Sequence, residues 1–203
     1  LQNANFIIKN LWSSEGNLYH NYKNKKSTIN GYLEDYCFVI DAFISLYEVT
    51  FEENWLQNAK QLTDYCFEHF YDERKGFFAF TSNLDEALIT QHFETEDNVI
   101  PASNSVMAKN MYQLSIYFNN SYYEKISEQM LHLVIPGIDY PSAFSNWLDL
   151  GLNYSGENRE LAICSAEAKT YCQEINGLYI PNIVLAGTQK TSTLPFLKDR
   201  FTN

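Results

Sequence analysis

The residues best suited to chemistry crowd into one stretch of the chain, 88–107. Acidic and amide side chains, among them Asp97, precede Pro101. A helical pattern then begins at Ser103 and Asn104. Because the first backbone N–H groups of a helix are unpaired, polar groups gathered there are suited to meet a ligand. An Asx turn with a helix N-cap would explain the same residue types without a ligand. We interpret the stretch as part of a ligand cleft in which Asp97 does polar or acid–base work.

A second group of candidate residues lies at the start of the apolar helical pattern 33–50. Asp35 and Tyr36 fall in its first turn, and His20 precedes it. A carboxylate in this place could bind sugar hydroxyls or act as a general acid or base, and an imidazole could serve as a base. Interaction of first-turn acids with the helix dipole is the alternative without function. His20, Asp35 and Asp97 are therefore the candidate catalytic residues.

Aromatic side chains are the third candidate feature. The chain holds 15 Tyr and 14 Phe among its 203 residues. A globular core can use Tyr with its hydroxyl at the surface, so packing alone accounts for this content. The alternative is that aromatic rings line a sugar-sized groove, and in that case Tyr36, Phe78 and Phe80 would stack on the sugar ring.

The charge and the cysteines limit the expected partners. The net charge is −11 at pH 7, which argues against nucleic acid and anionic membranes because both select basic surfaces. No apolar run approaches the roughly 20 residues needed to span a bilayer. The four cysteines form no CxxC pair and no zinc-spaced cluster with histidine. We expect reduced thiols, a cytoplasmic location, and neither a metal nor another cofactor.

Helical periodicity dominates the first three quarters of the chain. Apolar spacing predicts helices over 3–12, 33–50, 54–70, 104–118, 121–134 and 142–150, with short strands over 16–22 and 76–81. Within this series, largely buried helices alternate with half-exposed ones. That alternation is typical of helix hairpins arranged in a toroid or solenoid, and an irregular all-α domain is the alternative.

The pattern changes near residue 158. Strands are predicted over 160–164 and 183–185, and a helix over 166–175 that ends at Gly177. This βαβ-like unit lacks a GxGxxG motif, so a nucleotide site is not expected. We divide the chain into a helical-hairpin region, residues 1–157, and a small, truncated α/β cap, residues 158–203.

Several segments together resemble one family. They are 16–20, 31–40, 46–50, 76–81 and 97–109. The chain resembles the thioredoxin-domain-containing proteins of the YyaL and spermatogenesis-associated type, the DUF255 family, over most of its length. The resemblance implies a mainly α fold: a six-hairpin (α/α)6 toroid, similar to that of N-acylglucosamine 2-epimerases and six-hairpin glycosidases, preceded by a thioredoxin-like domain. This chain would be the C-terminal part of that toroid with its cap, and thus a piece of a longer protein.

Two motifs of the family can be placed on this sequence. Its LDDY pattern falls on 33–36, with Glu34 in place of the usual Asp. Its D-x-x-x-P-S-x-N-S pattern begins at Asp97, with Ala102 in place of Ser. Gln91 stands where the family often has Arg, which makes the cleft more acidic and weakens the case for an activity that needs an anion-binding arginine.

The resemblance completes the list of candidate site residues. It places Gln91, Asn104 and Ser105 among the substrate-binding residues. An epimerase-type mechanism uses a pair of histidines, of which only His20 can be aligned. The family's toroid has no securely established catalytic role.

Three hypotheses follow for the function. The first is a partial toroid whose cleft binds or processes a carbohydrate or another small molecule, as an epimerase or glycoside hydrolase would. The second is a non-catalytic scaffold of a redox-associated protein, whose concave face binds a partner, and the third is a structural remnant. We rank the first above the second because polar groups gather at predicted helix N-termini. A partial toroid has an open edge, so we also expect a dimer through that edge or a further segment that completes the ring.

Overall fold

The structure, a computed structural model that describes residues 1–86, 88–156 and 159–200, is mainly helical, with two small sheets. The helices are α1 (Gln2–Asn10), α2 (Leu33–Thr50), α3 (Asn54–His69), α4 (Ser103–Phe118), α5 (Ser121–Val134), α6 (Ser145–Ser155) and α7 (Ala168–Asn176). The strands are β1 (Tyr71–Asp72), β2 (Phe77–Phe78), β3 (Arg159–Cys164) and β4 (Ile183–Thr188). The four long helices expected from 33 to 134 are confirmed to within one residue at each end.

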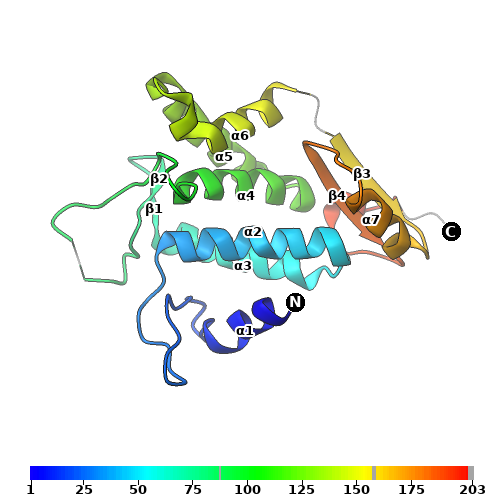
Figure 1. Cartoon of the computed structure of the whole chain (residues 1–203), viewed down its shortest axis with the longest axis horizontal. Coiled ribbons are helices and arrows are strands. Elements are labelled where there is room, and N and C mark those ends of the chain that lie inside the picture. The colour runs from blue at the N-terminus through cyan, green and yellow to red at the C-terminus, as the bar shows by residue number, and fades with distance from the viewer. Residues whose placement is uncertain (87, 157–158, 201–203) are drawn as a thin grey trace.

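Two helix hairpins form the centre of the molecule (Figure 1). The first pairs α2 with α3, and the second pairs α4 with α5. Phe51 and Asn119 end α2 and α4 with left-handed backbone, at φ 55° and 48°, which lets the chain reverse within a few residues. Asn120 then caps α5, because its side-chain oxygen accepts the backbone N–H groups of Tyr122 and Tyr123.

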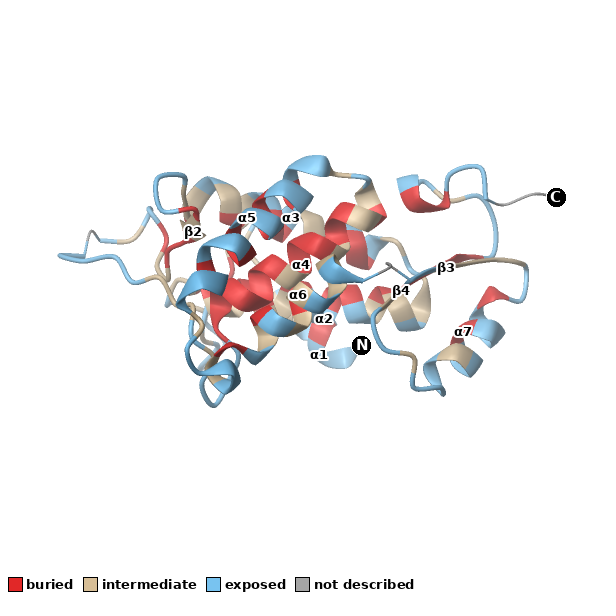
Figure 2. Cartoon of the chain, turned by 90° about the horizontal axis from the view of Figure 1, so that it is seen from above, coloured by how far each residue is buried: buried red, intermediate tan, exposed pale blue. Residues whose placement is uncertain are grey.

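The hairpins are stacked so that α2, α4 and α6 form one row. Helix α4 packs against both α2 and α6, and α5 packs against α4 and α6. The N-terminal ends of α2, α4 and α6 lie at the same end of the molecule, beside the β1–β2 hairpin (Figure 1). Figure 2 shows that burial is concentrated along α4, whereas α5 and α6 keep exposed faces. The expected alternation is clear for the second hairpin, with 12 of 16 residues buried in α4 and six of 14 in α5. In the first hairpin α2 and α3 are buried to a similar extent, with seven of 18 and six of 16 residues, so the expectation is wrong there.

Two local expectations were wrong. Residues 16–22 form no regular strand, and only isolated bridges join Leu18 to Trp12 and Tyr19 to Asn30. The reason is that the Leu18 N–H is bonded to the Tyr36 hydroxyl at 2.8 Å and not to a neighbouring strand. The helix expected from residue 142 begins instead at Ser145, after a 3-10 turn over Pro141–Phe144.

The C-terminal segment forms the expected βαβ unit. Strands β3 and β4 pair in parallel from Arg159 opposite Ile183 to Cys164 opposite Thr188, and α7 connects them. Gly177 follows the end of α7. This unit packs on the C-terminal ends of α2 and α4. The boundary that we placed between residues 157 and 158 lies outside the described residues.

Two further expectations concern the cysteines and the membrane. Cys37, Cys66 and Cys172 are buried and free, and Cys164 is half-buried and free. Within the part of the chain that the structure describes, no helix is both long and apolar enough to cross a membrane.

Candidate functional site

A histidine–aspartate pair lies at the start of α2. The Nδ1 atom of His20 is 3.0 and 3.1 Å from the two carboxylate oxygens of Asp35. Both side chains remain accessible, at 40% and 24% exposure. An ionised carboxylate only accepts hydrogen bonds, so in this pair Nδ1 carries a proton and Nε2 is the ring nitrogen that Asp35 leaves free. The pair thus has the geometry of a base held in place by an orienting carboxylate.

The local chain fold explains why these two residues meet. The backbone N–H of His20 donates to the Ile29 carbonyl at 2.9 Å, which folds the 18–30 loop back beside α2. Asp35 also accepts the backbone N–H of Tyr32 at 2.9 Å, so it satisfies an N–H at the helix start. Asp35 therefore performs the structural role expected of a first-turn acid and orients His20 as well.

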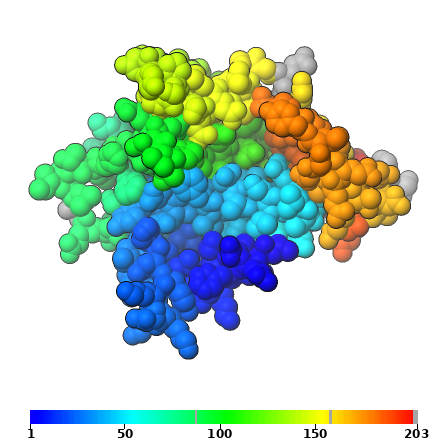
Figure 3. All heavy atoms as spheres, in the orientation of Figure 1, coloured from blue at the N-terminus to red at the C-terminus, as the bar shows by residue number. Residues whose placement is uncertain are grey.

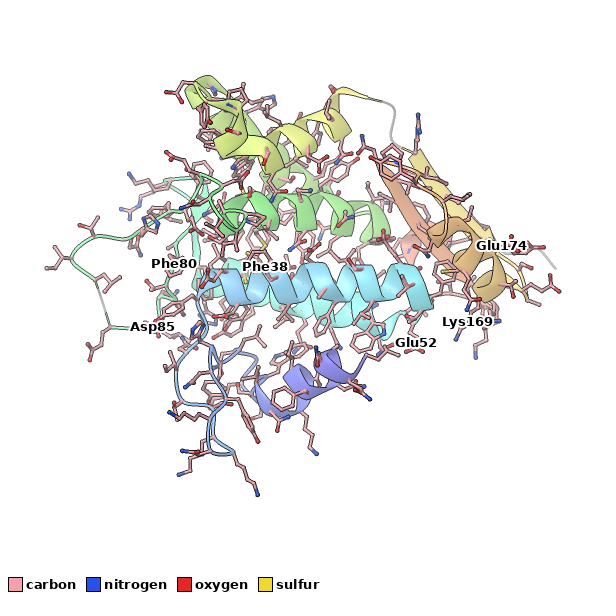
Figure 4. The ribbon with its side chains drawn as sticks, in the orientation of Figure 1. Phe38, Glu52, Phe80, Asp85, Lys169 and Glu174 are labelled. Carbon is pink, nitrogen blue, oxygen red and sulfur yellow. The ribbon has the colours of Figure 1, made fainter. Side chains whose placement is uncertain are left out.

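Aromatic rings form a row beside this pair. Tyr32 stacks on Phe80, with ring centroids 5.1 Å apart and an interplanar angle of 15°. His20 contacts the Tyr32 ring edge-on at 5.2 Å, and His92 contacts Phe80 edge-on at 6.1 Å. Figure 4 shows Phe80 beside the start of α2, where its carbonyl accepts the Leu33 N–H. Tyr32 and Phe80 are half-buried, so the row is accessible to a ligand.

Glu34 adds a carboxyl of altered acidity. Burial raises its pKa, and the charges of Asp35 and Glu94 raise it further, whereas His20 lowers it. Glu94 itself comes from the loop before α4 and accepts the backbone N–H of Ser103 at 3.0 Å. The starts of α2 and α4 therefore bring together a proton acceptor, His20, and a carboxyl that holds its proton more tightly than usual, Glu34.

Asp97 bonds to the residues that begin α4 and α6. Its Oδ1 accepts the Ala102 N–H and the Ser105 hydroxyl, both at 2.9 Å, and its Oδ2 accepts the Asn146 N–H at 2.8 Å. The carboxylate thus ties the loop to the starts of α4 and α6. These contacts match the alternative of an Asx turn with a helix cap. They also occupy most of the carboxylate lone pairs, which a catalytic role would need to be free.

Asn104 and Ser105 are fully buried, at 0% exposure. The Asn104 side chain pairs with both the N–H and the carbonyl of Phe78, at 2.9 Å each, as a neighbouring strand would. The Ser105 hydroxyl lies between Asp97 and the Ala102 carbonyl. Neither side chain faces solvent, so both hold the structure around the loop.

Three other candidates are also placed away from the accessible row. Tyr36 and Phe78 are 0% exposed and offer no ring face to a sugar, so the stacking role expected for them is not available in this structure. Tyr36 instead stacks on Tyr65 and bonds to the Leu18 N–H. Gln91 is exposed and lines a hollow beside the β1–β2 hairpin, together with residues 69–74.

Sequence reasoning missed a polar face along the row of helices. Asp41 of α2 is exposed, yet desolvation by its surroundings raises its pKa, while the charge of Lys109 of α4 lowers it. Lys109 bonds to Asp149 of α6 at 2.5 Å. Glu34 and Asp41 are seven residues apart on one helix, and that spacing would have marked a polar face in an otherwise apolar pattern.

The described residues contain no group of three or more His, Cys, Asp or Glu side chains that could hold a metal ion.

The chain is similar over most of its length to spermatogenesis-associated protein 20 of mammals. It is 28% identical to the Mus musculus protein over 186 residues, which cover 82% of this chain and 23% of that protein. It is 27% identical to the Homo sapiens protein over 186 residues, with the same two shares. The chain is therefore distantly homologous to these proteins and spans about a quarter of their length. No protein-family model matches the chain.

Proposed function

We propose that this chain binds a carbohydrate, or a similar small polyhydroxylated molecule, at the start of α2 and acts on it by acid–base chemistry. The single observation that carries the proposal is the His20–Asp35 pair at 3.0 Å, accessible and adjacent to stacked rings. The role of Asp35 is to keep the proton on Nδ1, so that Nε2 can accept one from the substrate. Glu34, whose pKa is raised, is the candidate proton donor.

The aromatic row gives this site its ligand class. Sugar rings present apolar C–H faces and polar edges, and half-buried aromatic rings complement the faces. Tyr32 and Phe80 are suited to this stacking, and Glu34, two residues after Tyr32, would accept hydroxyl hydrogen bonds. The proposal therefore keeps His20, Asp35 and Phe80 as functional residues and adds Tyr32 and Glu34.

The arrangement of helices supports a larger architecture in the same proposal. A row of α2, α4 and α6 with shared direction, and α3 and α5 packed outside it, is what a segment of an (α/α)6 toroid contains. In such a ring the starts of the inner helices face one opening. The His20–Asp35 pair would lie at that opening, and the ring itself would be completed by segments outside this chain.

A specific observation favours the alternative of a non-catalytic, partner-binding scaffold. The described residues of the loop between β2 and α4 include five exposed large apolar side chains, Leu84, Leu88, Ile89, Val99 and Ile100. Ile89 is 107% exposed and Val99 is 96% exposed. Exposed apolar groups clustered in one loop are typical of a protein contact.

Ligand-dependent thermal stability tests the proposal. We expect mono- or disaccharides at millimolar concentration to raise the melting temperature of the chain, because ligand binding stabilises the folded state. His20→Gln should abolish the increase, and Phe80→Ala should reduce it. His132→Gln on the exposed side of α5 is the matched control and should behave as the wild type. An unchanged melting temperature with every sugar would refute the proposal and favour the scaffold.

A further inference from the structure

A pocket of about 210 Å³, lined by polar and apolar side chains alike, lies where α4, α6 and the βαβ unit meet. Figure 3 shows the surface on which the spheres of α4 and α6 adjoin those of the C-terminal unit. Its residues are Lys109, Tyr112 and Gln113 of α4, Asp149 and Asn153 of α6, Arg159 of β3, and Ile180, Asn182, Ile183 and Val184 before and within β4. None of them belongs to the His20–Asp35 site.

Helices α4 and α6 each contribute two polar side chains to this pocket. Lys109 and Gln113 are four residues apart on α4, and Asp149 and Asn153 are four residues apart on α6, so each pair occupies one helix face. Lys109 is fixed by Asp149 at 2.5 Å and by Asn146 at 3.2 Å. The two helices therefore present a pre-positioned cation and several amide groups to the same space.

Arg159 adds a second cation to the pocket. The Lys109–Asp149 pair is neutral overall, whereas Arg159 forms no ion pair with any residue that the structure describes. The chain as a whole is acidic, but charges further away than about 8 Å are largely screened at physiological salt, so the local groups decide. A guanidinium binds phosphate or carboxylate oxygens through two parallel hydrogen bonds.

The size of the pocket and its uncharged residues indicate what else the ligand contains besides the oxyanion. The volume of about 210 Å³ is many times the roughly 10–15 Å³ that a single water needs, so the pocket has room for a small organic ligand. Gln113, Asn153 and Asn182 supply amide donors and acceptors for hydroxyl groups. Ile183 and Val184 supply an apolar wall.

We propose that this pocket binds a small hydroxylated oxyanion, of the class of sugar phosphates and sugar acids. Arg159 would bind the oxyanion, Lys109 would assist it, and the amides of α4 and α6 would bind the hydroxyl groups. The site is separate from the one at the start of α2, so either can exist without the other.

Calorimetric titration with three probes tests this assignment. Glucose 6-phosphate, gluconate and glucose share the polyol part and differ in the oxyanion. We expect the two anions to bind at least about tenfold more tightly than glucose, since only they engage the guanidinium. The stronger of the two identifies phosphate or carboxylate as the preferred group.

Variants locate the binding in this pocket. Arg159→Gln should weaken anion binding about tenfold or more, and Gln113→Ala should weaken it a few-fold. Arg74→Gln at the β1–β2 turn is the matched control, and His20→Gln separates this site from the proposed sugar site; both should bind the anions as the wild type does. Because Arg159 is exposed, its variant should keep the wild-type melting temperature. Absence of anion binding at about 10 mM, or equal binding by wild type and Arg159→Gln, would overturn the assignment.

Discussion

Glu48 is a carboxylate near the end of α2, where the helices meet the βαβ unit. Its Oε1 accepts the Tyr117 hydroxyl at 2.8 Å, and its backbone carbonyl lies 3.2 Å from both Cys172 Sγ and Asn176 Nδ2. Burial raises the pKa of its carboxyl, the Tyr117 hydrogen bond lowers it, and the charge of Asp41 raises it further. Among the described residues, no Lys or Arg pairs with it.

The raised pKa predicts how Glu48→Gln changes stability with pH. An acid with a raised pKa in the folded state is stabilising below its ordinary pKa, and this contribution is lost as pH rises through the folded value. At pH 7 the buried charge therefore costs stability, and the amide, which can still accept the Tyr117 hydroxyl, removes that cost. We expect urea unfolding to show a gain on the order of 1 kcal/mol at pH 7 and none near pH 4.

A surface variant provides the comparison for Glu48. Glu128→Gln on the exposed face of α5 changes the same functional group and should alter the free energy of unfolding by less than about 0.5 kcal/mol at either pH. If Glu48→Gln lowered stability at pH 7, the ionised carboxylate would be favourable, and the burial argument would be wrong.

The types of the site residues could be predicted from sequence, but their roles depend on partners far along the chain. The first-turn position of Asp35 suggested a cleft, and the partner that makes it a candidate, His20, is 15 residues away in a loop. Asp97 looked equally suitable, yet Asn146, 49 residues away, takes one of its oxygens. No local pattern encodes which carboxylate is left accessible.

At the level of elements, prediction succeeded where one helix face had to be buried. Helices α2 to α5 follow directly from 3.6-residue apolar spacing. Residues 16–22 alternate as a strand does, but Leu18 is buried by packing near Tyr36, without a ladder. Alternation of apolar and polar residues indicates only that one side of a segment is buried. A loop that lies against a helix has the same pattern as a strand.

The junction of the helices with β4 depends on a close approach at Gly187. A Cβ atom on this buried glycine would overlap the ring of Phe51, the residue that ends α2. The Gly187 N–H lies 3.4 Å from the Tyr47 hydroxyl, so the strand backbone rests directly on aromatic side chains. A larger residue at this position must move the ring or the strand.

Gly187→Ala is therefore predicted to weaken the attachment of the βαβ unit. Overpacking of this kind costs about 1–3 kcal/mol, measurable by chemical denaturation. The double variant Gly187→Ala with Phe51→Ala should recover part of this loss relative to Phe51→Ala alone, since the clash is removed. Gly151→Ala in α6, where a Cβ meets nothing within 4 Å, is the control and should be neutral or stabilising. Equal effects of the two alanines would exclude the clash.

At the scale of the whole molecule, the row of helices has two open edges. Helix α1 lies at one edge and α6 at the other (Figure 1). Leu148 and Leu152, four residues apart on α6, are 40% and 59% exposed, and Phe6 of α1 is 44% exposed. A helix normally buries such a stripe against a neighbour. The sequence predicts that α6 has an apolar face. It could not show that this face lies uncovered at an edge, because the pattern is the same whether or not the covering neighbour belongs to this chain.

The exposed stripe on α6 predicts that this chain associates with a second copy. Burying Leu148 and Leu152 against their equivalents would remove apolar surface from water, which favours a two-fold contact at raised concentration. Sedimentation should show a dimer at tens of micromolar, a concentration typical of weak association. Leu148→Glu with Leu152→Glu should give a monomer because the contact would then place like charges together. Leu178→Glu, at a position at least as exposed as either leucine but on the βαβ unit, should leave the dimer intact. A wild-type chain that remains monomeric at every concentration would contradict this prediction, because the exposed leucines of α6 would then stay in contact with solvent.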